Sequence, residues 1–178
     1  MSDVDQDLIN TTAVGLLRGV GSVLDVGCGD GSLVAHLARF GIHGVGVDTS
    51  PRAPAIKTRQ AMARVPRTGS CEKADAHDLS GIESEDFDAV TMVRTLHELS
   101  DPVRALKEAR RVLKKGGLLL IADFLRGHAG ERMWGERYYS LDEIIEMASR
   151  AGFEVVSTRR LPGEQFAFVL ARSIQIYD

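Results

Sequence analysis

The hydrophobic positions of this chain form short apolar runs separated by segments with a helical spacing. The apolar runs have the length of β-strands, and they lie at 22–26, 45–47, 87–93, 118–124, 153–158 and 165–171. A further strand is predicted at 70–74, where the pattern is weaker. A continuous apolar run is typical of a strand buried on both faces of a parallel sheet. Pro162 and Gly163 separate the last two runs as a hairpin turn would. The pattern therefore predicts an α/β fold with a seven-stranded, mostly parallel sheet whose last strand is antiparallel.

Helices are predicted where apolar residues recur every three or four positions. They lie at 4–18, 32–40, 53–65, 102–115 and 140–151. Asp101 is placed to cap the helix that begins with Pro102. Ser140 and Glu143 have the spacing of a capping box. Gly116 and Gly117 are expected to end the first of these helices, and Gly152 the second.

Length and charge restrict the class of protein. The 178 residues are predicted to form one domain. No apolar run approaches the roughly 20 residues that span a bilayer, and the polar start is not a signal peptide, so we expect no membrane contact and a cytoplasmic location. The net charge of −3 argues against a nucleic-acid partner, because such binding depends on phosphate neutralisation.

Several polar side chains carry no chemistry in this interpretation. Cys28 and Cys71 form neither a metal-ligand pattern nor an evident disulfide pair, so we interpret both as free thiols and expect no metal site. We expect His77 and His128 at the surface. The basic residues that follow Pro102 are interpreted as a solvated helix face. These are Arg104, Lys107, Arg110, Arg111, Lys114 and Lys115.

A glycine-rich turn joins the first predicted strand to a helix, and it is the strongest functional signal in the chain. Asp25 is followed by Gly27, Gly29 and Gly31 in alternation. Glycines at this spacing allow a sharp turn and a close approach of ligand to main chain. The next strand ends in Asp48, whose carboxylate can accept from the two hydroxyls of a ribose. The arrangement predicts a nucleotide-type βαβ unit.

The dinucleotide fingerprint fits this turn poorly. That fingerprint requires a small residue three positions after its second glycine, but Ser32 stands there and Gly31 comes one residue early. An acid two residues before a G-x-G-x-G run instead resembles motif I of the class I S-adenosylmethionine (SAM) methyltransferases. The string LKEARRVLKKGGLLLIADF, residues 106–124, is similar to the corresponding stretch of the same family. The resemblance covers roughly residues 20–172 and points to the small-molecule, methyltransferase-11 or UbiE-like branch.

The resemblance implies a fold and a cofactor. It implies a Rossmann-like sheet with strand order 3-2-1-4-5-7-6 and helices on both faces. It divides the chain into an N-terminal helix (1–19), a cofactor-binding core (20–124) and an acceptor-side loop, helix and hairpin (125–178). It also implies that SAM is the methyl donor and S-adenosylhomocysteine the product. The cofactor contacts that it implies are Asp25, Gly27, Cys28, Gly29, Gly31, Asp48, Thr49, Asp75, Ala76 and Arg94, with Asp75 facing the adenine amine.

The acceptor side is predicted from the segments after the fourth and fifth strands. Ligands in open α/β sheets bind beyond the carboxyl ends of strands, so His97 is a candidate general base and Glu98 a candidate partner. The alternative is that His97 packs beneath the cofactor or caps the next helix. Residues 126–139 form a long loop, and its Trp134, Tyr138 and Tyr139 either hold the substrate or pack the loop.

Three functions stay open at this stage. The first is a SAM-dependent methyltransferase that transfers the methyl group by in-line displacement to a small-molecule acceptor. The second is an NAD(P)-dependent Rossmann oxidoreductase, and the third is a non-catalytic SAM-binding partner subunit. Because the chain lacks a separate substrate domain, we expect either a small, partly exposed acceptor or a homodimer or partner subunit that completes the site. The acceptor atom is not predicted.

Overall fold

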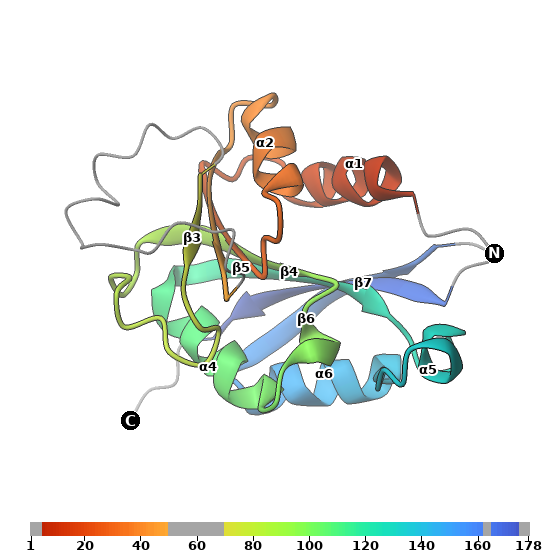
Figure 1. Cartoon of the computed structure of the whole chain (residues 1–178). Helices are drawn as coiled ribbons and strands as arrows, with labels where there is room; N and C mark the ends of the chain where they lie inside the picture. The colour runs from red at the N-terminus through yellow and green to blue at the C-terminus, as the bar shows by residue number, and fades with distance from the viewer. Residues whose placement is uncertain (1–4, 50–69, 162–164, 175–178) are drawn as a thin grey trace.

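The fold is a single twisted sheet with helices on both faces (Figure 1). The computed structural model describes residues 5–49, 70–161 and 165–174. The sheet has seven strands in the order β3-β2-β1-β4-β5-β7-β6, which confirms the predicted order. The predicted helix at 53–65 lies outside the described residues.

Six of the seven strands run in one direction. Neighbouring strands from β3 to β5 pair in parallel, and β7 is antiparallel to both of its neighbours, as the hairpin signal predicted. The strands are β1 (Ser22–Val26), β2 (His43–Asp48), β3 (Ser70–Lys73), β4 (Phe87–Val93), β5 (Leu113–Phe124), β6 (Phe153–Arg160) and β7 (Phe166–Ser173). Since chain direction reverses only at β7, the carboxyl ends of β1, β2, β4 and β5 meet at one edge of the sheet.

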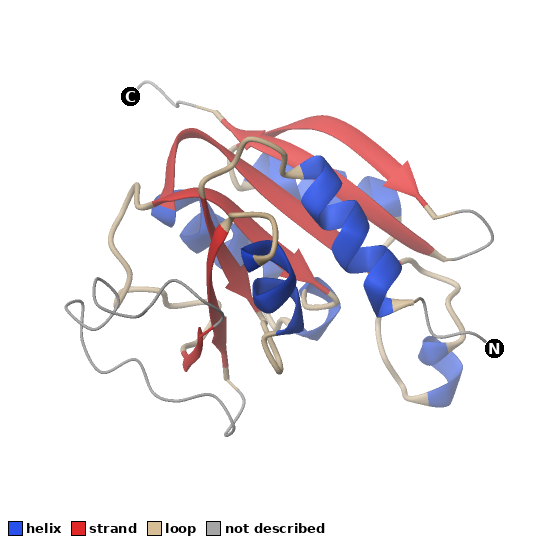
Figure 2. Cartoon of the chain, turned by 90° about the horizontal axis from the view of Figure 1, so that it is seen from above, coloured by secondary structure: helices blue, strands red, loops and turns tan. Residues whose placement is uncertain are grey.

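The helices cover the sheet in two layers (Figure 2). α1 (Gln6–Leu16) and α2 (Ser32–Ala38) lie on one face, and α4 (Pro102–Val112) and α6 (Leu141–Arg150) lie on the other. Each layer encloses its own hydrophobic cluster, and both clusters use side chains of the central strands. A 3-10 turn, η1 (Leu96–Glu98), follows β4, and a short helix, α5 (Gly130–Met133), interrupts the predicted loop.

Both predicted helix caps are confirmed. The Asp101 side chain accepts a hydrogen bond from Arg104 N at the start of α4. At the start of α6 the Ser140 hydroxyl accepts from Glu143 N while the Glu143 carboxylate accepts from Ser140 N, which completes the capping box. Each satisfies backbone N–H groups that a helix start would otherwise leave without a partner.

The end of α4 differs from the prediction. The glycines at 116 and 117 were expected to end the helix, but α4 ends at Val112 and β5 begins at once with Leu113. Leu113 pairs with Phe87, and the register shifts before Ala89 pairs with Leu118. Strand pairing with β4 therefore overrides the helical pattern in this stretch, because the extended backbone gains sheet partners that another helical turn would not have.

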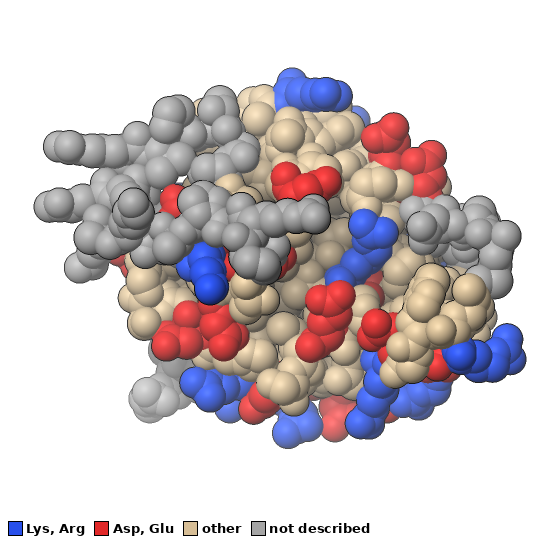
Figure 3. Space-filling model, viewed as in Figure 1, with Lys and Arg blue, Asp and Glu red and all other residues tan. Residues whose placement is uncertain are grey.

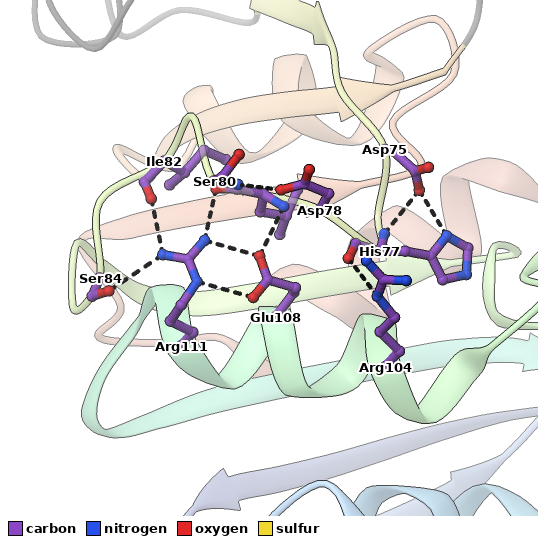
Figure 4. Close-up of polar contacts among 10 residues, drawn as sticks. Asp75, His77, Asp78, Ser80, Ile82, Ser84, Arg104, Glu108 and Arg111 are labelled. Carbon is purple, nitrogen blue, oxygen red and sulfur yellow. Dashed lines mark hydrogen bonds and ion pairs between the residues drawn. The ribbon is translucent and has the colours of Figure 1, made fainter.

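The basic face of α4 is also different from the prediction, because its arginines are held by specific partners (Figure 4). The Arg111 guanidinium donates to Glu108 and to the carbonyl oxygens of Leu79 and Ile82. Arg104 donates to the carbonyl oxygen of His77. These contacts attach the loop between β3 and β4 to α4, so the face is structural and not only solvated.

Neither histidine that was expected at the surface is freely exposed. The His77 side chain is 17% exposed, and its Nδ1 lies 2.7 Å from Asp75 Oδ1. The His128 ring stacks on Phe124, with ring centroids 4.2 Å apart.

Candidate functional site

A cavity of about 740 Å³ lies at the edge of the sheet where the carboxyl ends of β1, β2, β4 and β5 meet. Its walls come from the glycine turn after β1, the end of β2, the segment after β4, the end of β5, the loop before α6 and the start of α1. The lining residues are Asp5, Gln6, Asp25, Gly27, Cys28, Gly29, Asp30, Ser32, Leu33, Asp48, Val93, Arg94, Thr95, His97, Glu98, Phe124, Trp134, Glu136 and Tyr138. This is the position that the topology predicts for a ligand.

The glycine turn needs its glycines for two reasons. Gly27, Gly29 and Gly31 all have positive φ, at 78°, 52° and 79°, a region that other residues rarely adopt. A Cβ atom on Gly27 would also collide with the side chain of Thr95. At Gly29 a Cβ would meet nothing within 4 Å, so the turn is open on that side. Gly31 precedes α2 and is not part of the cavity wall described above.

Asp48 holds the turn from the next strand. Its Oδ2 accepts a hydrogen bond from Gly29 N at 2.8 Å. The backbone N–H groups of Gly27 and Cys28 also donate to the carbonyl oxygen of Val47. The glycine turn and the end of β2 therefore form one unit, with the Asp48 carboxylate at the cavity wall.

Asp25 is a buried acid at the base of the same wall. It is 2% exposed, and its Oδ1 accepts a hydrogen bond from the Thr91 hydroxyl at 2.6 Å. Burial is the main cause that raises the pKa of Asp25 to about 7; the Thr91 hydrogen bond opposes this and the charge of Asp48 adds to it. A cation in the cavity would stabilise the ionised carboxylate.

The cavity fits SAM at its methionine and ribose ends. The open glycine turn leaves room for a ligand against the main chain, and Asp25 and Asp48 suit the ammonium group and the ribose hydroxyls of the cofactor. Besides Gly31, three predicted contacts are not in the cavity wall. Thr49 is exposed after β2, Ala76 is buried in the core, and the Asp75 carboxylate accepts from the backbone N–H and the ring of His77. The hydrogen bonds from His77 are the main reason that the pKa of Asp75 is lowered.

His97 and Asp123 form a pair at the other end of the cavity. His97 Nδ1 lies 2.7 Å from Asp123 Oδ1, and His97 N donates to Asp123 Oδ2 at 3.1 Å. The two side chains are 7% and 2% exposed. A carboxylate at Nδ1 favours the tautomer with its proton on Nδ1, which leaves the Nε2 lone pair free to accept a proton.

Charges around His97 raise its pKa. Burial is the largest effect and lowers the pKa, but the hydrogen bond and charge of Asp123 and the charges of Glu98 and Glu136 together outweigh it. Nε2 lies 3.9 Å from Glu98 Oε1. Glu98 was predicted to orient the ring, but Asp123 holds it. Asp123 was missed, although it is an acid at the end of a buried strand, as Asp25 and Asp48 are.

The loop before α6 lines the cavity with alternate residues. Trp134, Glu136 and Tyr138 are cavity residues, whereas Tyr139 packs against the hydrophobic cluster under α4 and α6. Alternation of this kind is expected of an extended segment. Tyr138 is 2% exposed and packs edge-on against His97, with centroids 4.8 Å apart. Glu136 was missed because the aromatic residues alone were taken as the signal.

Arg94 closes the cavity beside α1. It has a positive φ of 54°, which is uncommon for a residue with a side chain. Its guanidinium donates to Gln6 Oε1 at the start of α1. Arg94 therefore links the end of β4 to the N-terminal helix across the cavity mouth.

The two cysteines are a disulfide pair, which corrects the prediction of free thiols. The Cys28 and Cys71 sulfurs are bonded, with Cα atoms 6.5 Å apart. Parallel pairing of β2 with β3 brings Cys71 opposite Gly46. A Cβ on Gly46 would lie 2.6 Å from Cys28 Sγ and 3.2 Å from Cys71 Sγ, so the glycine provides the space for both sulfurs. The sequence did not reveal this pair because the partners lie 43 residues apart.

Two features are absent from the described part of the chain. No helix there has both the length and the apolar character that crossing a bilayer requires. Among the same residues, no group of three or more His, Cys, Asp or Glu side chains is arranged to hold a metal ion.

Comparison with known proteins identifies the family. A family model described as a methyltransferase domain matches residues 24–121, more than half of the chain. A 2-phytyl-1,4-naphtoquinone methyltransferase of Trichormus variabilis is 35% identical over 133 residues, which cover 72% of this chain and 58% of that protein. A ubiquinone biosynthesis O-methyltransferase of Xanthomonas oryzae pv. oryzae is 32% identical over 109 residues, which cover 58% of this chain and 43% of that protein. The matches thus span about half the length of these relatives.

A solved structure shows the same fold. It comes from a Haloferax volcanii complex between the Trm112 methyltransferase activator and a methyltransferase, and it aligns with a TM-score of 0.76 at 20% identity over 93% of this chain and 90% of that chain. At 20% sequence identity, this likeness supports the fold alone. The matched domain and the curated relatives show that this chain belongs to the methyltransferase-domain family, in its class I SAM-dependent branch.

Proposed function

We propose that this protein is a SAM-dependent methyltransferase that acts on a small molecule with a proton to lose. The observation that carries this proposal is that one cavity joins the glycine turn with Asp48 at one end to the His97–Asp123 pair at the other. A cofactor-binding protein without an acceptor reaction would have no use for a buried carboxylate that orients a histidine toward the same cavity.

The cofactor end would be held by the chain in three ways. Asp48 would accept hydrogen bonds from the ribose hydroxyls while it keeps Gly29 in place. Asp25 would face the ammonium group of the methionine end, and the open side of Gly29 would leave space for the main chain of the turn to meet the ligand. When bound, SAM supplies an electrophilic methyl carbon on a positively charged sulfur.

The acceptor end would prepare the nucleophile. Asp123 holds His97 by its Nδ1 and its backbone N–H, so the ring is fixed by two hydrogen bonds. Nε2 is then directed to take a proton from the acceptor, while the buried Tyr138 ring supports the edge of the imidazole. Fixed orientation of this kind supplies much of the acceleration in a displacement reaction.

The names of the two relatives support a small, ring-containing acceptor. The two relatives are named for naphthoquinone and ubiquinone pathways, and the cavity includes the aromatic rings of Phe124, Trp134 and Tyr138. The Haloferax volcanii neighbour is a complex with an activator, so a partner that completes the site remains part of this proposal. The oxidoreductase alternative has no specific observation in its favour.

A turnover assay tests the proposal. Purified protein is incubated with SAM and single acceptors that carry a hydroxyl, amine, thiol or acidic C–H group, and S-adenosylhomocysteine is quantified. We expect product with at least one acceptor, and a kcat lower by on the order of 100-fold for His97→Asn with SAM affinity kept within twofold. Cofactor binding without turnover on any class would support the non-catalytic alternative instead.

A further inference from the structure

The acceptor end of the cavity combines carboxylates with aromatic rings. We propose that the methyl acceptor is an amine that binds as its ammonium cation between Glu98, Glu136 and the rings of Trp134 and Tyr138. This inference rests on the proposed methyltransferase function and adds the chemical class of the acceptor. It follows from the charge, the rings and the proton acceptor that the site presents together.

Acidic side chains predominate in the described wall of the cavity. Figure 3 shows how acidic and basic side chains are distributed over one face of the molecule. Carboxylates in the wall greatly exceed basic groups, and Arg94 is the sole lysine or arginine among its described residues. The acids are Asp5, Asp25, Asp30, Asp48, Glu98 and Glu136. Asp25 and Asp48 are assigned to the cofactor, and of the other four acids Glu98 and Glu136 are the two whose charges act on His97.

Glu98 and Glu136 act on the same small region. Burial is the main cause that raises the pKa of Glu98, the positive charge of His97 opposes it, and the negative charge of Glu136 adds to it. The same Glu136 charge raises the pKa of His97 and of Tyr138. The Glu136 charge disfavours the ionisation of Glu98, and a cation bound between the two carboxylates would oppose this effect. An anionic acceptor would add a third negative charge to this region.

The aromatic residues suit the same cation. Trp134 is 59% exposed at the cavity wall, and the buried Tyr138 packs against Phe124 with centroids 5.6 Å apart. The faces of tryptophan and tyrosine rings attract ammonium groups, and aromatic cages with carboxylates are a recurrent solution for amines. Glu136 lies between Trp134 and Tyr138 in the chain, and it lines the same cavity. An apolar acceptor would gain nothing from a carboxylate in this position.

Arg94 does not reverse this preference. Its guanidinium donates to Gln6 at the start of α1. This hydrogen bond holds the one lysine or arginine among the described wall residues to the N-terminal helix.

The pair of His97 and Asp123 completes the chemistry. The bound ammonium first transfers one proton to His97 Nε2, which frees the lone pair on nitrogen. That lone pair forms the new N–C bond to the donor methyl group, and the C–S bond breaks with its electron pair remaining on the sulfur. The positive charge passes from sulfur to the methylated nitrogen, where Glu98 and Glu136 stabilise it, and His97 returns its proton to solvent.

Three ligands that share one ring and differ in charge test this inference. Protein saturated with S-adenosylhomocysteine is titrated by calorimetry with 2-phenylethylamine, 2-phenylethanol and 3-phenylpropionate. We expect the amine to bind at least tenfold more tightly than the alcohol, and the carboxylate to bind most weakly. Glu136→Gln should reduce the preference for the amine at least fivefold. Glu146→Gln, which removes an exposed carboxylate on α6 outside the cavity, should leave the preference unchanged.

Several results would overturn the inference. These are equal or tighter binding of the alcohol or the carboxylate, no binding of any of the three ligands to protein that binds S-adenosylhomocysteine, or the same effect from Glu136→Gln and Glu146→Gln. If the native protein did not bind S-adenosylhomocysteine, this result would contradict the proposed function and not only the choice of an amine acceptor. If Glu136→Gln fails to fold, Glu98→Gln makes the same test from η1.

Discussion

His97 Nδ1 lies 2.7 Å from Asp123 Oδ1, and the two residues come from the ends of neighbouring strands. η1 follows β4 and presents His97, while Asp123 is the penultimate residue of β5. Parallel pairing of β4 with β5 brings these ends together. The acid-base group of the site is therefore a consequence of strand order, as is the contact between Gly29 and Asp48 at the cofactor end.

Replacing Asp123 with asparagine should change how His97 titrates. Asp123 raises the pKa of His97 against the effect of burial, so Asp123→Asn should bring that pKa below its native value. The acid limb of the pH profile of kcat should then move to lower pH. kcat should also fall because the ring loses its fixed tautomer. The His97 ring signal in an NMR titration measures the pKa directly, with Asp86→Asn as a control on an exposed loop acid. An unchanged His97 titration would contradict the role of Asp123.

The same pair gives a pH dependence of stability. A histidine whose folded-state pKa is raised contributes stability that is complete below its unfolded value of about 6.5 and is lost as pH rises through the folded value. We expect the free energy of unfolding of the native protein to lose this contribution above neutral pH, and Asp123→Asn to show less of the loss. Urea unfolding at a series of pH values measures it. A steeper loss in Asp123→Asn would exclude the pair as its source.

SAM affinity should rise with pH because Asp25 must ionise. Its folded pKa of about 7 lies above its ordinary 3.8, so ionisation of the unliganded protein costs stability progressively between about pH 4 and 7. A bound cation favours the ionised form, and between pH 6 and 8 the ionised fraction rises from roughly 10% to 90%, so affinity should improve by about tenfold. Calorimetry with S-adenosylhomocysteine measures this change. Asp25→Asn should bind more weakly with a flatter pH profile, and the same slope in both proteins would rule out Asp25.

The glycine turn should tolerate alanine poorly at Gly27. A Cβ there collides with Thr95, and the positive φ adds backbone strain. Gly27→Ala should therefore destabilise the protein by more than the ~1 kcal/mol of strain alone and should abolish cofactor binding. Gly19→Ala is a matched control, because Gly19 also has positive φ, at 84°, but a Cβ there meets nothing within 4 Å. Thermal unfolding and calorimetry compare the two, and equal effects would mean that the Thr95 contact does not matter.

Thiol counting tests the disulfide between Cys28 and Cys71. Protein purified without reductant and unfolded in guanidinium should show no free thiol with Ellman's reagent, and two after reduction. Because the bond closes a loop of 43 residues, it should stabilise the protein by up to about 4 kcal/mol. Reduction should lower the melting temperature of the native protein but not of Cys71→Ala. Two thiols before reduction would contradict the bond.

The sequence was sufficient for most strand positions, the glycine turn and the helix caps, because each has a local signal. Asp25 and Asp48 mark strand ends beside glycines, and Ser140 with Glu143 marks a helix start. The resemblance supplied the order of strands that local patterns leave open, and the sheet confirms it.

The remaining differences arise from contacts between distant segments. Asp123 could be linked to His97 only through the pairing of β4 with β5, and Cys28 to Cys71 only through the pairing of β2 with β3. The end of α4 was misplaced because sheet pairing at Leu113 overrides a helical spacing. Local periodicity does not contain such pairings, so they appear only in three dimensions.

The most direct test of the account is the ligand preference of the glycine turn and Asp48. The native protein and Asp48→Asn are titrated by calorimetry with SAM, S-adenosylhomocysteine and NADH. The account predicts micromolar binding of the first two ligands to the native protein, and a loss of more than tenfold, about 1.4 kcal/mol, in Asp48→Asn. Preferential binding of NADH, or SAM binding that is unaffected by Asp48→Asn, would contradict it.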